Sequence, residues 1–194
     1  SIGLLVPEGK ITITDMKAKE LVAIKAAGDI EITEVDAAKL TALITGKDAK
    51  INIDKTGIIN EIDIDADNIN LKKVNKTGSE PLYLDIKGGS KQMANEVSIN
   101  ISLKDIKDAA IVFERLYSDN TYINALVNNL RFDKMLVGSR ADIYNNYHYV
   151  IADNLNLELF TCDMQLYPED KEFYLIMGSD KMMSTDSFIM NYNP

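Results

Sequence analysis

The sequence has a single cysteine, Cys162, a single histidine, His148, and no tryptophan. A lone cysteine cannot form an internal disulfide, so no disulfide framework stabilises the chain. We interpret Cys162 as a small buried hydrophobic residue. Nucleophilic triads and histidine-based zinc sites need more than His148 offers, and we interpret it as a partly exposed strand residue.

Long apolar runs and basic runs are also missing. No run of about 18 apolar residues occurs, which is the length expected of a membrane-spanning helix. The chain has 30 acidic and 21 basic residues, a net charge of -9. Because binding to a phosphate backbone needs a dense basic face, this charge disfavours a nucleic-acid partner. Residues 1–7 lack the positive start of a signal peptide, and they open in mid-pattern, so we expect a segment of a longer protein.

Short alternations of apolar and polar residues recur through the first half of the chain. Each contains a pair of apolar residues: Ile11 with Ile13, Ile30 with Ile32, Ile51 with Ile53, and Ile69 with Leu71. Such alternation is typical of half-buried strands, and the period of about 20 residues between the pairs is typical of solenoids. We therefore expect the first members of these pairs to stack in one interior ladder.

A second apolar series lies between these pairs. Its members recur at nearly the same period as Leu21, Leu40 and Ile59, and as Ile24, Leu43 and Ile62. Leu82 and Leu84 then follow Ile62 and Ile64 one period later. Two series with one period predict two stacked strands in each coil.

The type of solenoid follows from what each period contains. The leucine-rich-repeat frame is absent, and each period has two or more short β-branched strands. Gly9 and Gly28 each precede a strand by one or two residues and suit tight corners. Residues 16–27 could form an amphipathic helix on propensity alone, but the shared register favours strand. We predict an all-β, right-handed, single-stranded parallel β-helix; the alternative is an ordinary sheet protein with a chance repeat.

The expected organisation is one β-helix segment over residues 1–194, with about eight to nine coils and a length of about 40 Å. Regular coils of about 20 residues cover 9–86. The Gly-rich polar stretch at 87–96 predicts an irregular loop excursion near 87–116, which includes a short helix or arm after residue 104. Residues 117–194 are expected to form longer, less regular coils, with strands near 122–126, 129–132, 141–144, 148–152, 155–160, 164–167, 172–177 and 187–192.

The acidic string at residues 61–67 is the main candidate for a metal site. Alternation places Glu61, Asp63 and Asp65 on one outward face. Calcium uses such oxygens, but the places that an EF-hand gives to Gly and Glu hold Asn68 and Val74. We interpret the string as a solvated acidic ladder and predict no metal-binding residues.

Candidate catalytic residues are few. A polysaccharide lyase or hydrolase needs clustered carboxylates with Arg, Lys or His, and neither Arg115, Arg131 nor Arg140 follows an acidic pair at a suggestive spacing. No phosphate-binding Gly-Lys-Ser/Thr loop and no Gly-x-Gly-x-x-Gly motif occurs. The sequence therefore predicts no catalytic residue, no cofactor and no enzyme activity. The tyrosines around His148 are interpreted as half-buried strand residues, with an exposed patch that meets a sugar as the alternative.

Two blocks of the sequence resemble a known group of proteins. Gly-Asp-Ile-Glu-Ile-Thr at 28–33, followed by Lys-Leu-Thr-Ala-Leu-Ile-Thr-Gly at 39–46, resembles the repeats of filamentous-haemagglutinin-type adhesins. The block at 129–138, with 141–146 and 150–154, resembles the passenger repeats of leukotoxin-type filamentous adhesins of Gram-negative bacteria. The resemblance covers roughly residues 9–190. It implies a secreted virulence protein at the bacterial cell surface, exported by an autotransporter-like or two-partner outer-membrane translocator.

These observations together predict a non-enzymatic structural and adhesive segment, a rigid rod that attaches to host or neighbouring cells through a surface protein or a glycan. Two alternatives stay open. One is a carbohydrate-active β-helix enzyme, and the other is a binding module that uses the 87–116 excursion as its ligand arm.

Overall fold

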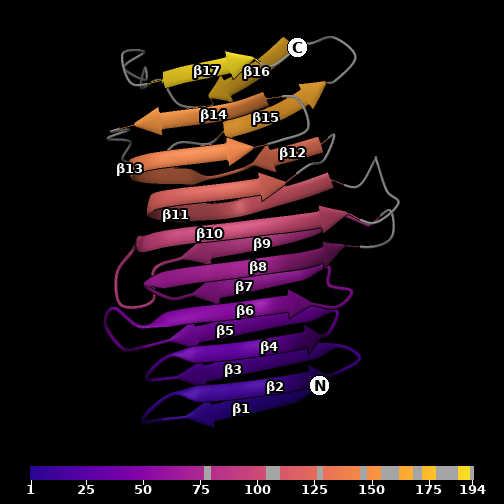
Figure 1. The fold of residues 1–194 in the computed structure, drawn as a ribbon, viewed down its shortest axis with the longest axis vertical. Helices are drawn as coiled ribbons and strands as arrows, with labels where there is room; N and C mark the ends of the chain where they lie inside the picture. The colour runs from indigo at the N-terminus through magenta and orange to yellow at the C-terminus, as the bar shows by residue number, and fades with distance from the viewer. Residues whose placement is uncertain are drawn as a thin grey trace.

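The computed structural model describes residues 1–76, 80–103, 110–125, 129–144, 148–153, 162–167, 172–177 and 188–192, and the side chains of 1–75, 80–102, 110–125 and 130–143. Within these residues every regular element is a β-strand, and the strands stack one above another along the long axis (Figure 1). The described residues contain no helix long and apolar enough to cross a membrane. The stretch 16–27 is strand with a turn, as the register predicted.

Two walls of parallel strands alternate along the chain. The odd wall consists of β1 (Ile2–Val6), β3 (Leu21–Ala26), β5 (Lys39–Ile44), β7 (Glu61–Asp65), β9 (Leu82–Lys87) and the start of β11. The even wall consists of β2 (Ile11–Lys17), β4 (Ile30–Asp36), β6 (Lys50–Thr56), β8 (Asn68–Lys76), β10 (Ala94–Leu103) and the end of β11. The long strand β11 (Ala110–Ala125) pairs with β9 and with β10, so it runs through both walls. The predicted all-β parallel solenoid is confirmed, with about six turns in place of eight to nine.

The predicted interior ladder is confirmed on the even wall. Ile30 lies beside both Ile11 and Ile51, and Ile51 lies beside Ile69. Val97 of β10 continues this column. All five side chains are buried, because a regular alternation turns the same positions of each strand toward the core.

The second predicted series has a different register. The inward columns of the odd wall are Val22, Leu40, Ile62 and Leu84, and Ile24, Ala42, Ile64 and Ile86. Leu21 lies beside Lys39, and Leu43 lies beside Asp65, so both point outward and are only half-buried. The spacing that relates Leu21 to Leu40 and Ile24 to Leu43 in the sequence therefore does not join register partners. The turns differ in length from coil to coil, and a slip of one residue moves a side chain to the other face of a strand.

The corner glycines stack as expected. The amide of Gly28 donates a hydrogen bond to the carbonyl oxygen of Gly9 at 2.8 Å. Gly9 has a φ of 84°, in the left-handed region that favours glycine. A Cβ atom on Gly28 would lie 2.6 Å from the same oxygen, so the two corners approach too closely for a side chain at position 28.

The interruption at 87–116 is shorter than expected. Residues 94–103 form β10, which pairs with both β8 and β11, and residues 110–116 belong to β11. Only 88–93 form a connecting loop, while residues 104–109 lie outside the described part of the chain. In the described part of this range, the predicted arm is therefore corrected to a short loop at 88–93 followed by wall strands, because the Gly pair marks a corner and not the start of an excursion.

Parallel stacking continues through β12 (Asn129–Phe132) and β13 (Met135–Tyr144), which both pair with β11. The rings of Phe113 and Phe132 stack with centroids 4.9 Å apart and are fully buried. Beyond β13 the pairing changes. Strand β14 (His148–Asp153) is antiparallel to β13, and β17 (Phe188–Tyr192) is antiparallel to β14.

Strands β15 (Cys162–Tyr167) and β16 (Glu172–Met177) form a separate antiparallel pair. The strands predicted near 148–152, 164–167, 172–177 and 187–192 are therefore present, but they do not pair as further parallel coils. Alternation predicts a strand without predicting the direction of its partner. The strand expected at 155–160 lies outside the described residues, as do the side chains of His148 and Cys162.

Candidate functional site

A buried carboxylate, Asp67, connects three corners of the solenoid. Its Oδ2 accepts hydrogen bonds from the amide of Asp48 at 2.8 Å and from Ser90 Oγ at 2.6 Å, and its Oδ1 accepts one from the amide of Ser90 at 3.0 Å. Burial alone would raise the pKa of Asp67, but the hydrogen bonds from Ser90 and Asp48 outweigh it and lower the pKa. We interpret Asp67 as a structural clamp, because its described hydrogen bonds all hold neighbouring turns.

A second cluster of charges lies on the outside of the odd wall. Lys87 Nζ is 3.7 Å from Asp63 Oδ1, 3.9 Å from Asp65 Oδ2 and 3.8 Å from Asp85 Oδ2. Arg115 Nε donates to Asp85 Oδ1 at 2.7 Å, and a terminal nitrogen of the same guanidinium bonds Asp85 Oδ2. Residues from β7, β9 and β11 thus meet at adjacent rungs. We call these five residues the odd-wall charge cluster.

The electrostatics of this cluster centre on Asp65. Burial raises the pKa of Asp65, and the nearby carboxylates of Asp63 and Asp85 add to this effect against the opposing charges of Lys87 and Arg115. Its Oδ1 atom is buried and has no hydrogen-bond donor among the described residues. In the described part of the chain, no group of three or more His, Cys, Asp or Glu residues is placed to hold a metal ion. The two cations instead face the carboxylates, so we interpret the cluster as a self-compensating network.

The acidic ladder predicted from the sequence is placed correctly but is not simply solvated. Glu61, Asp63 and Asp65 do point outward from β7. Glu61 pairs with Lys39 of the preceding odd-wall strand, and the two aspartates face Lys87 of the next. No sequence pattern pointed to Arg115, since its partner Asp85 is 30 residues away and only the stacking of coils joins them.

The even wall presents a different outer surface, on which amides and hydroxyls lie beside charged side chains. One outward column has one member per coil: Glu31, Asn52, Asn70, Ser98 and Tyr122. Asn52 Nδ2 donates to both carboxylate oxygens of Glu31 at 3.1 Å. Among the described residues, the side chains of Asn70 and Ser98 form no hydrogen bond. Their polar groups are half-exposed and therefore available to a ligand.

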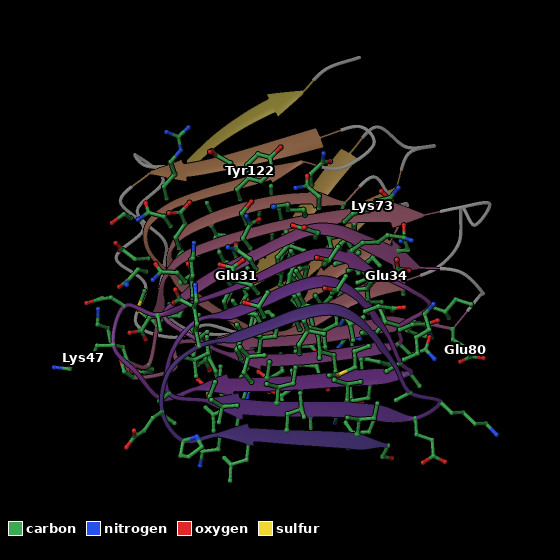
Figure 2. All side chains as sticks on the ribbon, turned by 60° about the horizontal axis from the view of Figure 1, so that its bottom comes forward. Glu31, Glu34, Lys47, Lys73, Glu80 and Tyr122 are labelled. Atoms are coloured by element: carbon green, nitrogen blue, oxygen red, sulfur yellow. The ribbon has the colours of Figure 1, made fainter. Side chains whose placement is uncertain are left out.

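A parallel column runs two residues away on the same strands, as Lys50, Asn68 and Glu96. Between the two columns lies a shallow depression of about 370 Å³, which we call the even-wall groove. It is lined by Lys50, Ile51, Asn52, Asn68, Ile69, Asn70, Glu96 and Ser98. Glu31 and Tyr122, labelled in Figure 2, lie in the first column on either side of Asn52, Asn70 and Ser98.

Another depression of about 380 Å³ lies at the turns on the side of the solenoid, lined in part by Lys17, Asp36 and the exposed Ile58. Its lining is assembled from the ends of strands and the turns between them. The tyrosine patch expected around His148 lies outside the described side chains, so its exposure stays a prediction. The even-wall groove is thus the surface with available polar groups in register, and no short motif in the sequence marks it.

Comparisons with protein-family models, with curated proteins and with solved structures found no match to this chain. The resemblance to filamentous adhesins therefore rests on the residues quoted above.

Proposed function

We propose that this chain is a non-enzymatic structural and adhesive segment of a large secreted cell-surface adhesin, a rigid rod that attaches a bacterium to host or neighbouring cells. The observation that carries the proposal is the continuous parallel pairing of strands in both walls from β1 to β11, which stacks the coils along one axis (Figure 1).

The rod owes its stiffness to backbone pairing between coils. Each strand from β3 to β10 pairs in parallel with the strand of the coil before it and with that of the coil after it. Bending the stack would break a row of hydrogen bonds along one wall, and each buried bond that is left unmade costs free energy. Stability in such a stack is a sum of coil-to-coil terms, so the rod can be long without a larger core.

Charged side chains on the outer walls pair across neighbouring coils. Lys55 Nζ bonds Glu34 Oε1 at 2.9 Å, and Lys72 Nζ bonds Asp54 Oδ1 at 2.5 Å. These exposed pairs each add little to stability, but they neutralise charge locally on a chain of net charge -9. These charged side chains are thus held by one another, and the side chains of Asn70 and Ser98, which bond no other described residue, are available for attachment.

The bacterial cell surface, the outer-membrane translocator and the role in virulence belong to this proposal through the resemblance of residues 28–46 and 129–154 to adhesin repeats. A role in attachment also agrees with the chemistry of the even wall, where several charged groups are paired and the side chains of Asn70 and Ser98 form no hydrogen bond with other described residues. The members of the odd-wall charge cluster engage one another, and none of them lines either of the two depressions described above.

The test is an adhesion assay with inert microspheres coated with the purified chain. Coated spheres should adhere to cultured epithelial cells or to neighbouring bacteria well above uncoated spheres. The matched control carries Ile32→Asp and Ile53→Asp, which place two uncompensated carboxylates in the core and should unfold the coils. Equal adhesion of spheres coated with either protein, or no adhesion at all, would count against the proposal.

One alternative has a specific observation behind it. The odd-wall charge cluster joins carboxylates to a lysine and an arginine, which is the type of residue set that cleavage of acidic polysaccharides needs. Incubation with polygalacturonate distinguishes the two, because an enzyme would release new chain ends and Asp85→Asn would abolish that release. We expect no release from either protein. The ligand-arm alternative has less support, since residues 94–103 and 110–116 form wall strands.

A further inference from the structure

We propose that the even-wall groove binds a linear, neutral glycan of the cellulose or chitin type, which lies along the axis of the rod. This inference rests on the proposed adhesive function and goes further by naming the class of ligand and the residues that contact it. It is carried by the position of Asn70 and Ser98 in the lining of the groove, where their polar groups form no hydrogen bond with other described residues.

The geometry of the groove suits a repeating ligand. Its sides are the two outward columns, and its floor includes the backbone of Ile51 and Ile69, whose side chains point into the core. The groove therefore crosses from β6 to β8 instead of following one strand. Neighbouring strands in a sheet are about 4.8 Å apart. That spacing is close to the length of one pyranose ring along an extended glycan. Successive sugar units would therefore meet equivalent positions on successive coils.

The chemistry of the groove suits sugar hydroxyls. The Asn70 amide offers two donors and an acceptor, and the Ser98 hydroxyl offers one donor with acceptor capacity. These groups lie on adjacent strands of the even wall, where Asn70 is the register partner of Ser98. A few placed polar groups of this kind are what orients a small ligand in a binding site.

An aromatic ring extends the same column. Tyr122 is the register partner of Ser98 on the next coil, and its side chain is 37% exposed. Aromatic rings offer a flat apolar surface to the carbon–hydrogen face of a pyranose, which adds a contact that water cannot replace. The column thus runs from the carboxylate of Glu31 through two amides and a hydroxyl to an aromatic ring.

Charge selects the neutral class of glycan. The groove has one cation, Lys50, and one anion, Glu96, so its lining carries no net charge. The whole chain has a net charge of -9, which repels uronate and sulfate polymers at long range. A neutral glycan avoids this repulsion and loses no charge solvation when it enters the groove.

The test is isothermal titration of the purified chain with cellohexaose and with chitohexaose, each compared with polygalacturonate. At least one neutral oligosaccharide should bind and the acidic polymer should not. The double variant Asn70→Ala, Ser98→Ala and the single variant Tyr122→Ala should each bind about five- to tenfold more weakly. Matched controls on the odd wall are Thr41→Ala and Tyr83→Ala, whose side chains are also outward and accessible and which should leave binding unchanged.

Glycan binding by the even-wall groove is refuted if neither neutral oligosaccharide binds to the folded chain. It is also refuted if Tyr83→Ala weakens binding as much as Tyr122→Ala. Far-ultraviolet circular dichroism of each variant shows that the coils are intact. The microsphere assay separates this failure from failure of the adhesive function. Adhesion that persists in the Asn70, Ser98 and Tyr122 variants would leave the rod an adhesin while removing the glycan groove from the mechanism.

Discussion

Arg115 and Asp85 form a two-pronged ion pair between neighbouring coils, although 30 residues separate them in the chain. Nε of the guanidinium donates to Oδ1 at 2.7 Å and a terminal nitrogen donates to Oδ2. The pair exists because the two residues are register partners on β9 and β11. Side chains that meet on the outer surface therefore come from neighbouring coils. Their separation in the sequence equals the length of the coil between them.

Truncation of an interior ladder residue should be costly. Ile53 is 1% exposed and lies beside Ile32 in the column next to the Ile11 ladder. Ile53→Ala should lower the free energy of unfolding by about 2 to 5 kcal/mol, because it removes buried contacts and leaves a cavity. Urea unfolding followed by circular dichroism measures the change. The same substitution at Ile58, which is 58% exposed, should change stability by less than about 0.5 kcal/mol. Similar losses at both sites would contradict the ladder.

A corner glycine should be irreplaceable where two turns approach closely. A Cβ atom on Gly46 would lie 2.1 Å from the carbonyl oxygen of Ala27, which belongs to the corner one coil earlier. Gly46→Ala should destabilise the protein by about 1 to 3 kcal/mol, since backbone must shift to admit the methyl group. Gly3→Ala is the matched control, because no atom lies within 4 Å of the place that its methyl group would take. Thermal unfolding compares the two, and an equal midpoint for both variants would argue against close corner packing.

Two aspartates near one corner should respond to pH in opposite directions. The pKa of Asp67 is lowered from its ordinary value of 3.8, so its carboxylate stabilises the folded state above that pH and the benefit disappears as the pH falls through the lower folded pKa. Asp67→Asn should therefore cost about 1 to 3 kcal/mol at neutral pH, and much less in strong acid. Urea unfolding at a series of pH values measures this difference.

Asp65 provides the comparison for this experiment. Its pKa is raised from 3.8, mainly by burial. The protonated carboxyl therefore contributes to folding stability below pH 3.8, and this contribution is lost as the pH rises through the higher pKa of the folded state. Asp65→Asn should be at least as stable as the unchanged chain at neutral pH, and this advantage should vanish in acid. The opposite result would be a loss of stability at neutral pH from Asp65→Asn as large as the loss from Asp67→Asn. It would show that the attraction between Lys87 and charged Asp65 outweighs the cost of burying that charge.

The open end of the solenoid should promote association of purified chains. Strands β1 and β2 end the two walls, each with one neighbouring strand, and Leu5 on β1 is 68% exposed. Unpaired edges with apolar side chains are templates for pairing with another chain. Leu5→Lys should lower the fraction of dimers and larger species seen by analytical ultracentrifugation. Ile58→Lys removes a comparably exposed apolar residue from a turn and should have no such effect. If both variants dissociate the assembly equally, the chains do not associate through the edge at β1.

The even wall shows how much a sequence can predict when spacing and alternation agree. Ile11, Ile30 and Ile51 were identifiable as one ladder because each is followed two residues later by another isoleucine. On the odd wall the apolar spacing differs from the true register by one residue, since Leu21 lies beside Lys39 and not beside Leu40. Leu21 and Leu43 are as apolar as the inward residues, yet they face outward and are half-buried. Apolarity alone does not say which face a residue occupies, and only the pairing of coils resolves it.

The candidate binding surface was not visible in the sequence. Asn70 and Ser98 lie far apart in the chain and belong to no motif, and their partnership depends on the lengths of the turns between β8 and β10. The charge cluster has the same origin. Residues that line an outer wall are brought together by coil stacking, while their spacing in the chain varies with each loop.

The amino-acid sequence by itself determined that this chain forms stacked strands with a shared apolar interior, because alternation that repeats with the length of one coil can bury its apolar side chains in that arrangement. The tertiary structure alone decided which outer side chains become neighbours and where parallel stacking gives way to antiparallel pairing after β13. Turn lengths and strand direction set those relations, and neither is encoded in the periodicity of apolar residues.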